Sequence, residues 1–215
     1  MHQRGTEAQA ALETLADLTL GRLATVGGEP RMARPHDGLL LLSNQRPSDH
    51  LAQVYDPVVC LVLQGAKEVT GTHSSYVISA GQLLVVTHDM PVVSRITEAS
   101  PQVPYVAAIL SLDRDTLADL ARHAPPAPPV GLGDHHALRA GDASPELLDA
   151  FLRAVRTLDS PADSDVLLPL AAREIHYRLL QSPPGQALRR LGNGHRPGEP
   201  VARAIGLIRG DLPRS

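Results

Sequence analysis

Ten histidines and a single cysteine are the residues of this 215-residue chain with the most obvious chemistry. Histidines bind metals when several converge, and a β-barrel metal enzyme would present two as H-x-H with a glutamate a few residues later. The corresponding segment here reads THSSYVI and contains His73 without a second histidine or the acid. We therefore expect no metal site and no cofactor. The other candidates are scattered over loops, strand ends and a helix: His88, His135, His136 and His176.

Cys60 is the strongest candidate nucleophile. It lies in the middle of the apolar run PVVCLVLQG (57–65), where a cysteine normally packs as a small apolar side chain. The alternative is a thiol in a ligand cavity that senses electrophiles by forming an adduct. No G-x-S-x-G motif is present, and GLG (131–133) lacks the further glycine and lysine of a phosphate-binding loop. We expect a protein that is not an enzyme.

Composition excludes several other classes. With 43% hydrophobic and 20% charged residues, the chain has enough apolar material for a core, which argues against disorder. A net charge of −3 does not favour nucleic-acid binding by this chain alone. No apolar run approaches the roughly 20 residues of a membrane span, and the acids near the start are unlike a secretion signal. A cytoplasmic protein with no membrane partner is expected.

The elements that must position these residues change type along the chain. Short apolar runs separated by Gly, Pro, Asn and Asp extend from Leu39 to Leu112. Such runs predict a barrel or a sandwich rather than alternating βαβ units. SAG (79–81) is expected to form a turn in which Gly81 takes a positive φ. Strands are predicted at 39–44, 57–65, 67–71, 75–78, 82–86, 92–97 and 105–112.

The pattern after Leu112 is helical. Asp113 or Asp115 is expected to cap the first helix, and Ser144 followed by Pro145 marks the start of another. The segment SPADSD (160–165) is interpreted as a break between two helices. Helices are predicted at 116–123, 144–159, 166–181, 186–192 and 201–210.

Composition also divides the chain into four parts. Residues 1–34 are expected to form an N-terminal arm that is helical or irregular. Residues 35–124 form the barrel, and the Pro- and Gly-rich residues 125–143 form a linker or loop. Residues 144–215 form a helical region whose apolar stripe must pack on the barrel, on itself or on a second subunit.

Several motifs in fixed order resemble one protein family. These are P-x-x-x-L-x-L-Q-G-x-K from Pro57, A-G-Q-x-L-V-V from Ala80, D-x-P-V from Asp89 and T-E-A-S-P-x-x-P-Y from Thr97. The segment LAAREIHYRLLQSPPGQALRRL (170–191) matches a further element, with Ser-Pro where Gly-Pro is usual. Over about residues 35–212 the chain resembles the N-terminal effector-binding and dimerisation domain of AraC-type transcriptional regulators.

The resemblance implies an α+β fold, in which a cupin-like β-barrel that binds a small effector is followed by helices that dimerise. It also implies a C-terminal pair of helix-turn-helix motifs that read DNA in the major groove, starting after a helix resembling residues 200–215. That domain is absent from this chain, so we expect DNA as a partner only through it. Residues 1–215 alone are expected to show no measurable specific DNA binding, because affinity depends on several cations that neutralise phosphates.

Alternation along the predicted strands indicates which residues face the barrel interior. Sugar-binding relatives carry large polar and aromatic groups near some of these positions, whereas this chain carries mostly small or apolar ones. We therefore predict a ligand less polar than a pentose, such as an aldehyde, an alcohol, an aromatic compound or a fatty fragment; the alternative is that these side chains only fill the barrel. The predicted effector-binding residues are Cys60, Val62, Gln64, Ser94, Tyr105, Ala107 and Ile109.

Two of the predicted helices, 144–159 and 166–181, are candidates for the interface of a homodimer. Their apolar residues are spaced to form a seam with a neighbouring subunit, although the same residues could instead cover the barrel. The predicted interface residues are Leu148, Leu152, Val155, Leu168, Ile175 and Leu179.

Three functional hypotheses remain open from sequence. The leading one is a regulatory domain that binds an effector, dimerises and does no catalysis. The alternative is a small cupin-type metal-dependent enzyme, an isomerase or a dioxygenase, which would need at least three inward-facing ligands. The third is a binding module for a sugar or a carboxylate that has no DNA partner.

Overall fold

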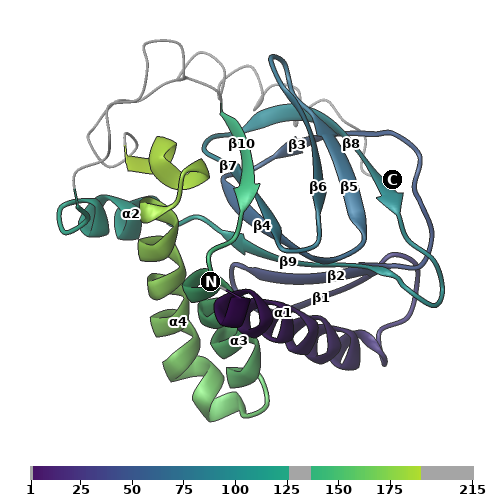
Figure 1. Ribbon diagram of the computed structural model, residues 1–215, viewed down its shortest axis with the longest axis horizontal. Helices are drawn as coiled ribbons and strands as arrows, with labels where there is room; N and C mark the ends of the chain where they lie inside the picture. Colours follow the sequence, from purple (N-terminus) through teal and green to yellow (C-terminus); the bar gives the residue numbers. More distant parts are fainter. Residues whose placement is uncertain (1, 126–136, 190–215) are drawn as a thin grey trace.

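The computed structural model describes residues 2–125 and 137–189. Within these ranges two antiparallel sheets are followed by a group of helices (Figure 1). The strands are β1 (Arg31–His36), β2 (Leu39–Asn44), β3 (Leu51–Tyr55), β4 (Val58–Gln64), β5 (Ala66–Thr70), β6 (Ser75–Ser79), β7 (Gln82–Val86), β8 (Met90–Glu98), β9 (Tyr105–Ser111) and β10 (Leu138–Asp142). The helices are α1 (His2–Leu23), α2 (Arg114–Ala121), α3 (Pro145–Thr157), α4 (Pro161–Gln181) and the short 3₁₀ helix η1 (Pro184–Leu188).

The two sheets face each other as a cupin-like sandwich. One sheet has the strand order β1-β2-β9-β4-β7-β10, and the other has the order β3-β8-β5-β6. The predicted α+β class, with a cupin-like barrel followed by helices, is therefore confirmed. The two sheets join where β4 of the larger sheet passes directly into β5 of the smaller one. This corner is Gly65, whose φ of +75° requires glycine.

Alternation along the six-stranded sheet separates its side chains into two groups. On β4, Val59, Leu61 and Leu63 lie in a core shared with the helices, whereas Cys60 and Val62 lie in the core between the two sheets. We call these two sides of the six-stranded sheet the helix face and the barrel face. Because residues on both faces of β4 are buried, its sequence is a continuous apolar run.

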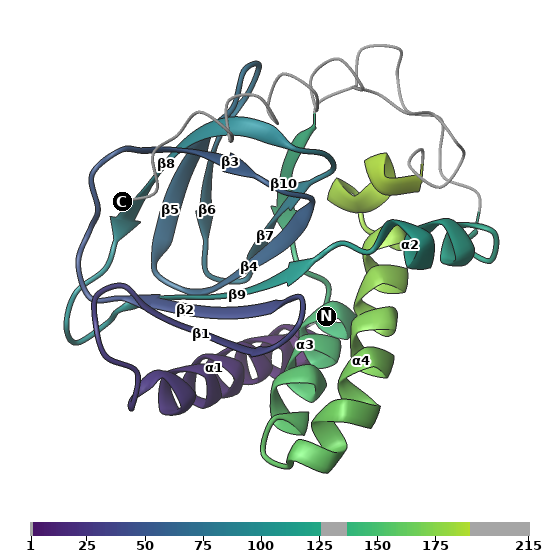
Figure 2. The same ribbon diagram turned by 180° about the vertical axis from the view of Figure 1, so that it is seen from behind.

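The N-terminal arm is part of the structure on the helix face. Helix α1 contacts β1, β2, β4 and β9, and Figure 2 shows it along the outer side of β1 and β2. Leu15 and Leu23 of this helix are completely buried. Helix α3 packs on α1 and α4, and α4 also contacts α2. None of the helices in the described ranges is long and apolar enough to cross a membrane.

Three strands were not predicted, and each lies at the edge of a sheet. They are β1, β3 and β10, and β10 lies inside the segment 125–143 that was expected to be a linker or loop. Half or more of the residues of β1 (RMARPH) and β3 (LAQVY) are exposed, and β1 also carries two arginines. Their apolar alternation is correspondingly weak, which explains why the pattern did not reveal them.

The predicted helix starts are confirmed at two positions and wrong at a third. The Asp113 carboxylate accepts a hydrogen bond from the Thr116 amide at 2.7 Å and caps α2. The Ser144 hydroxyl accepts from the Leu147 amide at 3.2 Å and caps α3. Helix α4 starts at Pro161 rather than at residue 166, because Ser160 is itself a cap and is followed by proline.

The remaining local predictions have mixed outcomes. Gly81 adopts a φ of +82°, as its turn requires. Of the helix expected at 186–192, residues 186–188 belong to the 3₁₀ helix η1, which starts at Pro184, and residues 190–192 fall outside the described residues. The helix expected at 201–210 falls outside the described residues.

Candidate functional site

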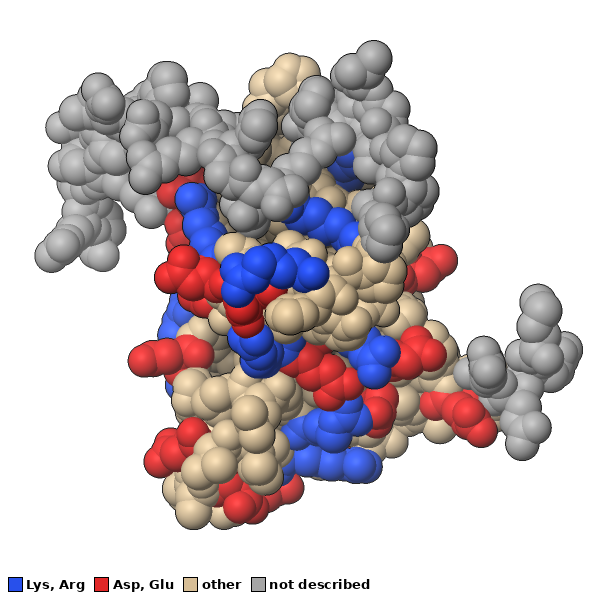
Figure 3. Space-filling view, turned by 90° about the vertical axis from the view of Figure 1, so that its left-hand side faces the viewer, with Lys and Arg blue, Asp and Glu red and all other residues tan. Residues whose placement is uncertain are grey.

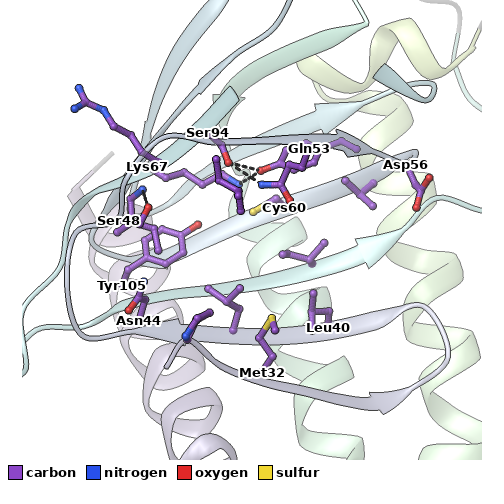
Figure 4. Close-up of a pocket in the computed structure, with 18 of the residues that line it drawn as sticks. Met32, Leu40, Asn44, Ser48, Gln53, Asp56, Cys60, Lys67, Ser94 and Tyr105 are labelled. Atoms are coloured by element: carbon purple, nitrogen blue, oxygen red, sulfur yellow. Dashed lines mark hydrogen bonds between the residues drawn. The ribbon is translucent and has the colours of Figure 1, made fainter. Parts of the chain in front are cut away.

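A cavity of about 690 Å³ opens between the two sheets, at the end of the barrel formed by β1, β2 and β3 (Figure 4). This volume is in the range of small-molecule sites. The centre of its wall on the six-stranded sheet is apolar and consists of the paired residues Leu40, Ile109 and Cys60, which lie side by side on β2, β9 and β4. The opposite sheet contributes Val54 and Ile96. Such a lining favours a ligand with an apolar body.

A group of polar side chains interrupts the apolar wall on the four-stranded sheet. It consists of Gln53, Tyr55, Lys67 and Ser94, which we call the polar cluster. The Ser94 Oγ accepts hydrogen bonds from the Gln53 amide at 2.9 Å and from the Tyr55 hydroxyl at 3.2 Å. The Lys67 ammonium donates to the Tyr55 hydroxyl oxygen at 3.3 Å. Figure 4 shows Lys67, Gln53 and Ser94 across the cavity from Met32 and Leu40.

Lys67 is the only lysine of the chain and is 8% exposed. Its Nζ lies 5.2 Å from the centre of the Tyr55 ring, a favourable position for a cation. Burial acts to lower the pKa of Lys67, but interactions with Cys60 and Tyr55 outweigh burial and raise the pKa above its ordinary value. The direction of this shift favours the charged ammonium form of Lys67.

Cys60 and Tyr105 lie on the barrel face of the six-stranded sheet and line the cavity. Cys60 is 2% exposed and lies near enough to Lys67 and to Tyr105 to raise the pKa of each. Burial, followed by the influence of Cys60 and Tyr55, raises the pKa of Tyr105 well above its ordinary value. Tyr105 is therefore a neutral phenol that can donate a hydrogen bond.

The structure brings together four of the seven predicted effector-binding residues. Cys60, Ser94, Tyr105 and Ile109 line the cavity. The other three residues do not. Val62 and Ala107 are paired with each other and completely buried. A β-bulge interrupts β4 between Val62 and Gln64, and the Gln64 amide donates to the Pro104 carbonyl at 2.8 Å.

Sequence reasoning missed three of the four residues of the polar cluster. Gln53 and Tyr55 lie on β3, an edge strand that was not predicted, so neither was considered. Lys67 did carry a signal, because it is the single lysine and lies in the predicted strand 67–71. The pairing of β5 with β6 and β8 places Lys67 opposite Ile78 and Ile96. Lys67 therefore lies on the same side of the sheet as Ile96, which also lines the cavity.

Metal ligands do not assemble in the described parts of the chain, where no three His, Cys, Asp or Glu side chains come together. His88 contacts the Thr87 hydroxyl. His176 of α4 accepts a hydrogen bond from the Asp113 amide at the start of α2. His135 and His136 fall outside the described residues. The cupin-enzyme alternative finds no supporting donor set in these ranges.

The predicted dimer seam is corrected by the structure. All six residues are at least nine-tenths buried within one chain. They pack in the core under the helix face because α3 and α4 contact each other and α3 contacts α1. Their spacing therefore reflects packing inside the subunit, and their side chains are not available to a second copy. These residues are Leu148, Leu152, Val155, Leu168, Ile175 and Leu179.

A different face of α4 exposes apolar side chains. Val166, Leu167 and Leu170 are 64%, 44% and 62% exposed, and their spacing places them on one side of the helix. Elsewhere, ion pairs such as Arg173–Asp119 and Arg153–Glu174 connect neighbouring helices. Figure 3 shows this side of the molecule with positive and negative side chains interspersed rather than separated.

A comparison with protein families finds one that covers most of the chain. The family described as "AraC-type transcriptional regulator N-terminus" matches residues 35–187. This range includes every strand that surrounds the cavity except part of β1. A comparison with curated proteins finds no match.

Solved structures resemble the chain only weakly. Apo ToxT from Vibrio cholerae has a TM-score of 0.48 at 11% identity over 83% of this chain and 67% of its own. The AraC-like activator CuxR has a TM-score of 0.39 at 14% identity over 86% and 66%. A cupin-2 domain protein from Shewanella frigidimarina has a TM-score of 0.31 at 10% identity over 43% and 91%. The chain thus spans about two thirds of the two regulators.

Proposed function

Because this chain belongs to the family of AraC-type transcriptional regulator N-termini, we propose that it is the effector-sensing and dimerisation part of a transcription factor. In this proposal it works by binding a small molecule rather than by catalysis. DNA is contacted through the helix-turn-helix domain that the family carries after this region. A regulator of transcription acts where the chromosome is, which places the protein in the bacterial cytoplasm.

The observation that carries this proposal is the cavity in the barrel. It lies within the matched residues, combines an apolar wall with one polar cluster, and has a volume of about 690 Å³. Small-molecule sites commonly have these properties. Cys60, Ser94, Tyr105 and Ile109 are proposed contacts of the effector, together with the polar cluster.

A neutral fluorescent probe tests the cavity directly. N-phenyl-1-naphthylamine brightens in apolar surroundings, and we expect it to bind the chain. Leu40→Trp, which fills the cavity from β2, should weaken probe binding about tenfold or more, the ratio that corresponds to about 1.4 kcal/mol. Val77→Trp is the matched control because Val77 is 62% exposed on β6, and it should bind the probe like the parent chain. Equal probe binding by both variants would contradict the proposal.

Dimerisation is proposed through the exposed apolar face of α4. Val166, Leu167 and Leu170 form a cluster that a second copy would remove from water. Sedimentation at micromolar concentration should show a dimer, and Leu170→Glu should give a folded monomer, with a melting temperature lowered only by the lost association. Val77→Glu, an equally exposed site on the barrel, should remain dimeric. A monomeric parent chain, or a dimer that survives Leu170→Glu, would rule out this interface.

A further inference from the structure

The cavity contains a cation whose recorded partners are all neutral. Lys67 donates to the Tyr55 hydroxyl at 3.3 Å, lies against the Tyr55 ring and approaches the Cys60 thiol. Its neighbours on the adjacent strands, Ile78 and Ile96, are apolar. A lysine buried to this degree normally has a charged partner, because removing an ammonium from water is unfavourable.

The acidic residues around the cavity do not supply that partner. Glu68 follows Lys67 on β5, points to the other face of the sheet and forms an ion pair with Arg95 at 2.8 Å. Asp49 and Asp56 line the cavity but are exposed. Of the ion pairs recorded within the described residues, none includes Lys67.

The hydrogen bonds of the polar cluster also leave donors in excess. The Lys67 ammonium donates to Tyr55, Tyr55 donates to Ser94, and Gln53 donates to Ser94 as well. Ser94 Oγ thus accepts twice. Its own hydroxyl hydrogen and the remaining ammonium hydrogens are left for an acceptor. A cluster with a positive charge and spare donors is suited to an anionic oxygen ligand.

We propose that the cavity selects a small molecule with a single carboxylate on an apolar body, and that Lys67 pairs with this carboxylate. A carboxylate matches one ammonium and offers two acceptor oxygens, which can accept from the Lys67 ammonium and from the Ser94 hydroxyl. A doubly charged phosphate would need a second buried cation, whereas Arg34 and Arg95, which also line the cavity, are exposed, and Arg95 is paired with Glu68. The inference depends on the proposed effector-binding function of this cavity, and it revises the expectation from sequence by adding a charge to an otherwise apolar ligand.

Competition between matched acids and amides tests the inference. Decanoate and 1-naphthylacetate, each beside its primary amide, are titrated at pH 7.5 against bound N-phenyl-1-naphthylamine. The two pairs differ in body shape, whereas the members of each pair differ only in the charged oxygen. At least one acid should displace the probe at about tenfold lower concentration than its amide, and no amide should be preferred to its acid.

Variants at Lys67 assign the selectivity to one residue. Lys67→Met keeps the length and the apolar stem, so it should still bind the neutral probe, with whatever affinity serves as its own reference, and it should bring the acid-to-amide ratio close to one. Lys67→Arg should keep a ratio above one. Arg122→Met removes an exposed cation at the end of α2, outside the cavity lining, and as the control it should leave the ratio unchanged. Lys67→Gln replaces the methionine variant if that variant fails to bind the probe.

The outcomes separate this inference from the proposed function. If the parent chain binds the neutral probe and shows no preference for either acid, the carboxylate inference is wrong and the cavity proposal stands. If the acid preference survives in Lys67→Met and Lys67→Gln, another residue pairs with the carboxylate and the role of Lys67 is overturned. If the parent chain binds neither the probe nor the acids, both proposals fail together.

Discussion

The helix face and the barrel face of the six-stranded sheet are built from the same strands but are packed differently. On the helix face, the apolar side chains of β2, β4, β7 and β9 meet α1, α2, α3 and α4 in one continuous core. On the barrel face a smaller core adjoins a cavity of about 690 Å³ with the polar cluster across it. The helix face thus contributes mainly to stability. The barrel face instead leaves a cavity and a buried charge, which are features of a binding site rather than of a stable core.

Residues next to each other on one strand show this difference most directly. Leu110 on β9 is 4% exposed and packs into the helix-face core, whereas Ile109 lines the cavity on the barrel face. Both are large aliphatic side chains on a central strand. Their surroundings, and not their types or their strand, decide what each contributes. The following predictions test this contrast, from the largest expected effect to the smallest.

Truncation of these two neighbours should have unequal effects. Leu110→Ala is expected to lower the free energy of unfolding by about 2–5 kcal/mol, because it opens a hole in a close-packed core. Ile109→Ala should cost less, because its side chain already borders open space, yet it should change the affinity for N-phenyl-1-naphthylamine. Urea unfolding and probe titration measure the two effects. Equal losses of stability would show that the two faces are packed alike.

The corner that joins the two sheets should tolerate no side chain. Gly65→Ala is expected to cost more than the roughly 1–2 kcal/mol of a left-handed residue, because the added Cβ would collide with the Glu98 carbonyl oxygen. Gly38→Ala is the control. Its φ of +86° is similar, but its Cβ would lie 3.7 Å from the nearest atom, on Ser111. If thermal unfolding shows the same loss for both variants, close approach of the sheets is not what requires Gly65.

Loss of a helix cap should weaken only the helix face. Ser144→Ala removes the hydroxyl that accepts from the Leu147 amide and should lower stability by about 1 kcal/mol. Ser144→Asp, which retains an acceptor, should restore most of that loss. Probe binding at the barrel face should stay the same in both variants. A change in probe affinity would show that the two faces are coupled.

The smallest expected effect is a pH dependence of stability that arises at the contact between α4 and the start of α2. His176 Nε2 accepts from the Asp113 amide at 2.9 Å, and its Nδ1 donates to the Ala172 carbonyl at 2.6 Å. Burial lowers the pKa of His176, opposed by the Ala172 bond and by Asp113 and reinforced by Arg173. As the pH falls, His176 therefore becomes protonated at a higher pH in the unfolded chain than in the folded chain. Stability should be constant above the ordinary histidine pKa of about 6.5 and should decline as the pH falls below it.

A variant that cannot titrate checks this assignment. His176→Gln should flatten the decline of the melting temperature between pH 7 and the acid range. His88 also has a lowered pKa, from burial and Arg114, so His88→Gln measures its separate share. An unchanged decline in His176→Gln would show that another group is responsible.

The sequence by itself determined the features that depend on neighbouring residues. Seven of the ten strands in the described residues, the caps at Asp113 and Ser144, and the turn at Gly81 follow from local alternation, hydrogen bonding and backbone freedom. The motifs between residues 55 and 191 were enough to identify the family, which the match over 35–187 confirms. These signals need no knowledge of distant contacts.

Only the tertiary structure decided which distant residues meet. The pairing of β5 with β8 and of β8 with β3 brings Lys67, Ser94 and Tyr55 together from three strands, and no local pattern encodes that pairing. The same holds for the apolar stripes of α3 and α4, whose spacing suits a partner subunit as well as a neighbouring helix. Periodicity states which side of an element is apolar, but the long-range packing selects what covers it, because hydrophobic burial is non-directional.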